Sequence, residues 1–285
     1  MQIGSKGKWV LSPRAMGYGW LGLAGITWLL MALGSATRVM DAGLACPDWP
    51  LCFGSVIPTA QMDLQVFLEW FHRVVASLVG LYTICLAGWA WWQRRLAWAG
   101  VGAVVLVLAQ GILGGLTVTE FLKFEIVTAH LGTGLLFFSY VLGFALILLD
   151  PQPRYGYTWR VAIGVVAVLL VYGQSLLGGL VASQWALHQC LDSQTLCAVI
   201  ANHLWGIIPA SVGVMATAIA GWGKWRKLTY IILTLWLLQL WVGYTTYRLQ
   251  LSLPLLTVMH QAIGALLLGS LVVFTILSAR QPTTP

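Results

Sequence analysis

Charged residues are scarce in this sequence. Only 8% of its 285 residues are Asp, Glu, Lys or Arg, and just eight of these are acidic. A soluble domain has about 25% charged residues. Hydrophobic residues make up 59% of the chain. This composition excludes an ordinary soluble globular domain and indicates a membrane protein.

The sequence contains several long apolar runs. Eight of them are long enough to cross a hydrocarbon core of roughly 30 Å as helices. We therefore predict an all-α polytopic membrane protein with eight transmembrane helices. The first run spans about twenty residues, longer than the 7–15 of a signal-peptide core, so we expect it to be retained. The eight runs lie at residues 17–36, 66–92, 98–118, 126–149, 159–182, 198–222, 227–246 and 254–278.

The net charge of +7 follows the expected topology. If the N-terminus is inside, the inner segments carry eleven Lys and Arg residues and the outer loops only Arg38, Lys123 and Arg248. The positive-inside rule then predicts that both termini are cytoplasmic. The basic excess therefore reflects the topology of a protein surrounded by membrane lipid, and we expect no nucleic acid partner.

Four of the five cysteines fall in two close pairs, in "CPDWPLC" and "CLDSQTLC". Both pairs lie in predicted outer loops, where disulfides persist, so we predict two disulfides, Cys46–Cys52 and Cys190–Cys197. A metal site is the alternative, although neither pair has C-x2-C spacing, and one pair acting as a redox-active dithiol stays open. Cys85 lies within the second run and is predicted to be a small packing residue.

The histidines reveal an internal repeat. His72 and His130 are 58 residues apart, and His203 and His260 are 57 apart. Across the halves the separations are 131 and 130, and "AQGILGGL" resembles "GQSLLGGL". We predict two tandem four-helix bundles, residues 1–150 and 151–285, that share one orientation in the membrane.

All four histidines lie at matched depth, about 6–9 Å below the outer boundary of their spans. Two histidines facing each other in a four-helix bundle are a common way to hold a haem iron. The alternative is that each histidine is a polar residue bonded to a neighbouring helix. Glycines two to four residues beyond the histidines, in "TAHLGTG", "NHLWG" and "MHQAIG", favour close approach of a flat ring or of another helix. We predict one haem site per half.

Glu69 breaks the symmetry between the halves. It lies three residues before His72 and shares its helix face, whereas the equivalent residue of the second half is Ile200. Glu69 is therefore predicted to place a buried carboxyl beside the His72 ring. The alternative is that it forms a structural hydrogen bond to another helix. Arg73 and Arg38 are candidates for contacts with haem propionates, or they extend to water.

Together these motifs resemble the heme A synthase family. The likeness rests on "GLACPDWPLC", "EWFHR", "TAHLG", "NHLWG" and "MHQAIG", and it extends from about residue 20 to 278. Bacterial members with cysteine pairs in both outer loops are most similar. The resemblance implies a multi-pass oxidoreductase of the bacterial cell membrane that converts the C8 methyl of haem O to a formyl group by successive hydroxylations, giving haem A for terminal oxidases.

The same resemblance assigns the site residues. It implies that His72 and His130 ligate the substrate haem O, that His203 and His260 ligate a haem b cofactor, and that Glu69 is catalytic. It also matches the two cysteine pairs to the family's outer disulfides. The role of the glutamate stays open between stabilising a cation, capturing it covalently and moving protons.

Two other classes of protein fit part of the pattern. A non-catalytic di-haem b-type electron carrier explains the histidines but leaves Glu69 without a role, and a haem transporter needs no second permanent haem. The sequence is compatible with a homo-oligomer and with a heme O synthase that delivers the substrate. It does not identify the electron-transfer partner or the source of the formyl oxygen.

Overall fold

The computed structural model describes residues 2–3, 9–10, 12–94, 96–150, 154–183 and 194–280. Within them, eight long helices are apolar and long enough to cross a membrane. This confirms the predicted fold class. The helices are α1 (Pro13–Val39), α2 (Leu64–Trp92), α3 (Ala97–Thr119), α4 (Phe124–Leu149), α5 (Trp159–Ser183), α7 (Gln194–Gly221), α8 (Arg226–Arg248) and α9 (Pro254–Ala279).

Local signals fix where the first two helices begin. Ser12 precedes α1, and its hydroxyl accepts a hydrogen bond from the Ala15 amide at 3.1 Å. Asp63 precedes α2 and accepts from the Val66 amide at 2.8 Å. Both residues satisfy amides that have no partner inside the helix. Within the hydrocarbon the remaining backbone groups must bond internally, which is why the apolar runs form helices.

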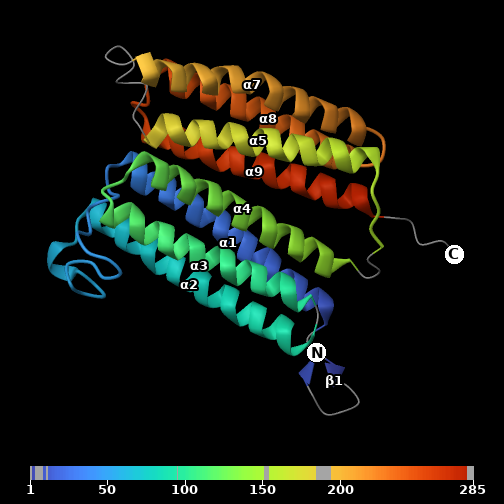
Figure 1. The fold of residues 1–285 in the computed structure, drawn as a ribbon, viewed down its shortest axis with the longest axis horizontal. Coiled ribbons are helices and arrows are strands. Elements are labelled where there is room, and N and C mark those ends of the chain that lie inside the picture. Colours follow the sequence, from blue (N-terminus) through green and yellow to red (C-terminus); the bar gives the residue numbers. More distant parts are fainter. Residues whose placement is uncertain are drawn as a thin grey trace.

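The helices form two groups of four, shown as the lower and upper rows of Figure 1. In the N-terminal unit, α1 packs on α2 and α4, and α3 lies between α2 and α4. In the C-terminal unit, α5 packs on α7 and α9, and α8 joins α7 to α9. Each group is therefore a closed ring of four helices, and α5, α7, α8 and α9 repeat the arrangement of α1 to α4.

The two units pack against each other through α1, α4, α5 and α9. The ring of Phe138 in α4 fills the space beside Gly269 in α9, where an added methyl would lie only 3.0 Å away. The indole of Trp28 in α1 donates to the backbone oxygen of Ala262 in α9 at 3.0 Å. Buried residues concentrate on α4 and α9, and α1 adds the large buried side chains of Met16, Trp20 and Leu23, so these helices form the centre of the molecule.

Three contacts link the units at the end where α9 finishes. Arg280 forms an ion pair with Asp150 at 3.0 Å and donates to the Leu146 oxygen at 3.2 Å. The Tyr155 hydroxyl donates to Asp150 at 3.3 Å. The connection between the units is therefore tied back onto α4.

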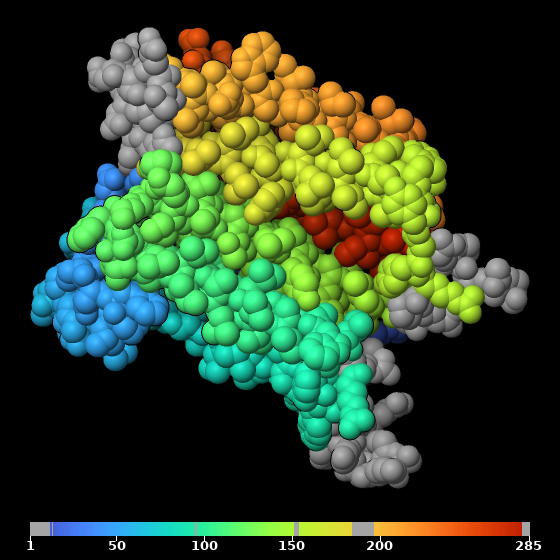
Figure 2. Space-filling model, in the orientation of Figure 1, coloured from blue at the N-terminus to red at the C-terminus, as the bar shows by residue number. Residues whose placement is uncertain are grey.

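The outward surface of the helices is largely apolar, as a lipid-facing surface should be. Between α4 and α5 the surface is hollowed, and Figure 2 shows α9 at the bottom of the hollow. Two apolar grooves of about 150 and 290 Å³ lie there, and Val272 and Ile276 of α9 line both. No histidine lines either groove, so they are separate from the candidate site.

Short elements complete the described chain. Strands β1 (Gln2–Ile3) and β2 (Trp9–Val10) form a small antiparallel pair, which the sequence analysis did not predict. A loop connects α1 to α2 and contains the 3-10 helix η1 (Thr59–Gln61). This loop, residues 40–63, is called the first outer loop below, after the side of the membrane predicted for it from the sequence. It lies at the end of the bundle opposite the start of α1 (Figure 1).

Candidate functional site

Every candidate histidine lies in the first three turns of its helix and faces a glycine on the helix before it. A methyl group added at Gly243 would lie 2.6 Å from Cε1 of His260, and one added at Gly34 would lie 2.9 Å from Cε1 of His72. Only glycine lets the backbone approach the rings so closely. The four pairs are Gly34–His72, Gly114–His130, Gly178–His203 and Gly243–His260.

The histidines come together in twos, one pair in each unit. His72 and His130 are close enough to interact electrostatically, and so are His203 and His260. The Nδ1 atoms of His72, His130 and His260 are buried and have no hydrogen-bond partner within the described ranges. Buried nitrogen atoms without partners are costly in a protein interior. Their arrangement fits a pair of metal-binding imidazoles in each unit.

Glu69 lies at the centre of a network that, among the described residues, is found only in the N-terminal unit. Its side chain is 5% exposed. One carboxylate oxygen pairs with the guanidinium of Arg73 one turn further along α2, and the other accepts from the Cys46 amide at 2.7 Å. The equivalent positions in the C-terminal unit are Ile200 and Leu204, which have no charge. The carboxylate therefore has partners on both sides and is held in place.

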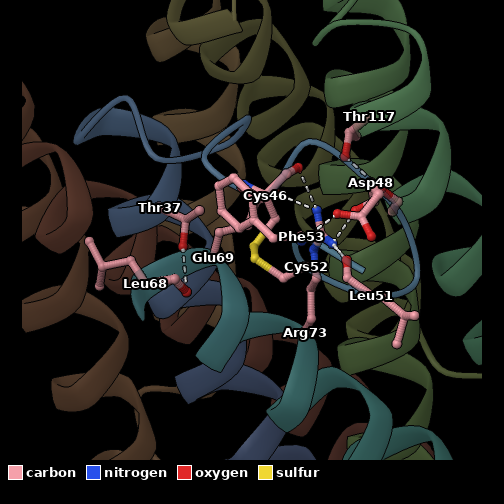
Figure 3. A network of polar contacts seen from close by, with 11 residues as sticks. Thr37, Cys46, Asp48, Leu51, Cys52, Phe53, Leu68, Glu69, Arg73 and Thr117 are labelled. Atoms are coloured by element: carbon pink, nitrogen blue, oxygen red, sulfur yellow. Dashed lines mark hydrogen bonds and ion pairs between the residues drawn. A yellow bond between two sulfur atoms is a disulfide. The ribbon is translucent and has the colours of Figure 1, made fainter. Parts of the chain in front are cut away.

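Arg73 extends from α2 into the first outer loop, as Figure 3 shows. Its guanidinium donates to the backbone oxygen of Asp48 at 2.6 Å and to that of Cys46 at 3.3 Å, and also to that of Leu51. Three loop carbonyls and one carboxylate thus surround a single side chain. In the structure, this arginine joins the loop to Glu69.

The first outer loop is fixed by several further bonds. Cys46 and Cys52 form a disulfide, which confirms that prediction. The Asp48 carboxylate accepts from the amides of Phe53 and Gly54 at 2.6 and 2.9 Å. The indole of Trp70 donates to the Val56 oxygen at 2.7 Å. The loop is therefore a rigid cover over the outer end of α2.

The second predicted disulfide lies partly outside the described residues. Cys197 is disulfide-bonded, whereas its predicted partner, Cys190, lies outside the described ranges. Cys85 is a free thiol, but it is exposed on α2 and does not pack inside the protein as expected. An exposed cysteine on a membrane helix faces the lipid.

Arg38 lies near the outer end of α1. Its guanidinium donates to the backbone oxygen of Ser183 at the end of α5, at 3.2 Å. Ser183 in turn shares a hydrogen bond with Thr128 of α4 at 3.3 Å. Arg38 thus lies where the outer ends of the two units meet.

Three glutamines near the histidines were not singled out from the sequence. The side-chain amides of Gln110 and Gln174 donate to the backbone oxygens of His130 and His203, each at 2.8 Å. The amide of Gln239 lies 3.3 Å from the ring of His260. The repeated text "AQGILGGL" and "GQSLLGGL" contains two of these glutamines together with the glycines that face the histidines, and was the available signal.

Fold and site together define a class of protein. It is a polytopic helical membrane protein made of two similar four-helix units, each with two facing histidines near the same end. One unit also has a buried carboxylate held beneath a disulfide-closed loop.

Comparison with known proteins gives the family. Residues 18–272 match the family described as cytochrome oxidase assembly protein, and the chain belongs to that family. Relatives named heme A synthase from Rhodospirillum centenum and Lysinibacillus sphaericus are 25% and 24% identical, over 96% and 92% of this chain and 91% and 95% of their own. These matches confirm the resemblance seen in the sequence.

Other relatives match over a shorter region at higher identity. The heme A synthase of Shewanella oneidensis is 30% identical over 194 residues, which are 58% of this chain and 56% of that protein. In this and similar alignments the match spans little more than half of the relative, or less.

Proposed function

We propose that this protein is a heme A synthase, a multi-pass oxidoreductase of the bacterial cell membrane. Its substrate is haem O, and its reaction converts the C8 methyl group to a formyl group by two successive hydroxylations. The product is haem A for terminal oxidases. The names of the relatives and the asymmetry between the two units support this proposal.

The histidines supply the means of holding two haems. We assign His72 and His130 to the substrate haem O, and His203 and His260 to a haem b cofactor. The buried ring nitrogens and the facing glycines suit this role, because neutral imidazoles ligate haem iron and glycine leaves room beside the ring. When bound, haem b supplies one-electron redox chemistry.

The main support for the proposal is the buried carboxylate of Glu69, because the equivalent residue of the C-terminal unit is Ile200. An electron carrier with two equivalent haems needs no such group, whereas oxidation of a methyl group develops positive charge at carbon. Glu69 lies on the face of His72, and Arg73 and the Cys46 amide fix its position. A fixed negative charge of this kind stabilises a cationic transition state without reorganisation. Since both carboxylate oxygens already have partners, we favour this role over covalent capture.

The two arginines differ in their positions and contacts. Arg73 contacts three loop carbonyls and Glu69, so its main role is to position the carboxylate. We assign the propionate contact to Arg38 first, since it lies near the outer end of α1, where the two units meet. A heme O synthase is the class of enzyme that must supply the substrate, and the oxidation also needs an electron-transfer partner.

The proposal is tested by identifying the haems. The protein is purified from cells that also make haem O synthase, and the haems are extracted, separated and weighed by mass spectrometry. Haem B together with haem O or haem A is the expected result. Haem B alone at both sites would instead identify a di-haem electron carrier.

A further inference from the structure

Three of the four histidines have a glutamine beside them. In each case the glutamine lies on the preceding helix, four residues before the glycine that faces the histidine, so both lie on one face of that helix. In α1 the corresponding residue, four before Gly34, is Leu30. The three pairs are Gln110–Gly114 in α3, Gln174–Gly178 in α5 and Gln239–Gly243 in α8.

The glutamines of the C-terminal unit contact histidine rings. The side-chain nitrogen of Gln174 lies 3.1 Å from Nδ1 of His203, and that of Gln239 lies 3.3 Å from Nε2 of His260. Both glutamines pack closely, because the chain opposite them is glycine: Gly206 faces Gln174 and Gly264 faces Gln239. As placed, each amide N–H faces a ring nitrogen that has no proton; a ring that binds iron through its other nitrogen carries a proton here, so the amide must then turn over and present its oxygen.

The N-terminal unit lacks this arrangement at both of its rings. Gln110 donates to the backbone oxygen of His130 and does not bond its ring. Leu30 has no polar group to offer His72. In the part of the chain that the structure describes, the buried Nδ1 atoms of His72 and His130 have no hydrogen-bond partner. The units therefore differ in how firmly they fix their histidines.

This difference has a direct chemical meaning. An imidazole that binds iron through one nitrogen carries a proton on the other, and a partner for that proton fixes the rotation of the ring and raises its basicity. A glutamine amide presents an oxygen acceptor as well as a nitrogen donor. The side-chain oxygens of Gln174 and Gln239 are buried and have no other partner among the described residues. Turning the Gln239 amide over breaks no other bond among the described residues, whereas turning the Gln174 amide gives up its bond to the His203 backbone oxygen; either turn presents the oxygen to the ring proton.

We infer that Gln174 and Gln239 are positioning residues that fix His203 and His260 for a permanently held haem, whereas the rings of His72 and His130 are left unfixed so that a haem can enter and leave. The inference rests on the proposed function for the identity of the two haems. It assigns retention to the C-terminal unit and exchange to the N-terminal unit through side chains that do not themselves bind iron.

The test compares Gln174→Leu and Gln239→Leu with the matched control Gln110→Leu, all in the full-length protein. The first two variants should bind haem b about 10–100-fold more weakly, since loss of such a partner typically has that effect. They should also shift the low-spin ferric EPR signal and raise the haem b midpoint potential. Gln110→Leu should leave the EPR signal and the potential of haem b unchanged, because its glutamine lies in the other unit.

A second pair of variants separates positioning from packing. In Gln174→Glu and Gln239→Glu a carboxylate accepts the ring proton more strongly, so the midpoint potential should fall rather than rise. Shifts of opposite sign for Leu and Glu support the inference. Unchanged EPR signals and potentials in all four variants, or equal effects of Gln110→Leu, would overturn it. Haem extraction from the wild type decides the proposed function separately, because it identifies the haems whatever the glutamines do.

Discussion

Replacement of Glu69 by Gln tests whether the reaction needs the negative charge of this residue or only its hydrogen bond to the first outer loop. Glutamine keeps the length of the side chain and an oxygen for the Cys46 amide, but it places an NH₂ group or a neutral oxygen against Arg73. Arg73 keeps its three loop carbonyls. We therefore expect a loss of about 2 kcal/mol in the stability of the loop, the usual size for a hydrogen bond to a charged group.

That loss is small beside the roughly 5–15 kcal/mol that stabilises a folded domain, so Glu69→Gln should insert and fold. It should retain haem b, whose proposed ligands lie in the other unit. If the charge stabilises the transition state, haem A formation should fall by about 10²–10³-fold, as when one preorganised group is removed from an enzyme. Haem O or its hydroxylated intermediate should accumulate.

Asp48→Ala is the matched control for the loop. It removes the acceptor of the Phe53 and Gly54 amides and so loosens the same loop by a similar amount, but it leaves Glu69 and Arg73 in place. The assay is haem extraction, chromatography and mass spectrometry from cells that also make haem O synthase. Near-normal haem A from Glu69→Gln, or an equal loss of haem A in Asp48→Ala, would refute a role for the charge.

Four further predictions follow from the fold and the site. Replacement of His203 or His260 by Ala should remove haem b, whereas replacement of His72 or His130 should remove haem O alone, as extracted haem will show; equal loss of haem b from all four would indicate two equivalent sites. Mass mapping without reductant should find Cys46–Cys52 and Cys190–Cys197 linked and Cys85 free, and free thiols in the outer loops would contradict this. Leu30→Gln gives His72 the amide that it lacks, so the haem O retained after detergent washing should rise roughly tenfold; unchanged retention would count against ring fixation. Cysteines introduced singly at Lys224 and Asp41 should react with an impermeant thiol reagent from the inside and the outside respectively, and the reverse pattern would invert the topology.

The helices could be predicted from the sequence because each depends on its own residues. The run at 98–118 became α3, Ala97–Thr119, and the run at 66–92 became α2, Leu64–Trp92. Lipid requires every backbone group to bond within the segment, so an apolar run of sufficient length forms an α-helix. The start of α7 at Gln194 was placed four residues late, because polar residues of its first turn carry no hydropathy signal.

The site was harder to predict because its contacts join distant segments. The spacing of Glu69 and His72 was visible, but the bonds of Arg73 to loop carbonyls depend on how the first outer loop folds back onto α2. The glutamines near the histidines could not be predicted as site residues for a related reason. A glutamine in an apolar run says little until the helix opposite it is known, and Gln239 lies 21 residues from its histidine.

The hydrogen bond from Trp28 to Ala262 also has a consequence for biogenesis. It joins residues 234 positions apart, in the first and last helices of the chain. At roughly 5–20 residues per second, the indole of α1 is made about 10–50 s before its acceptor exists. Throughout that interval α1 is in the bilayer with an unsatisfied donor and without the face of α9 against which it packs. A chain that ends before α9 therefore lacks both the acceptor for the Trp28 indole and the helix against which α1 packs.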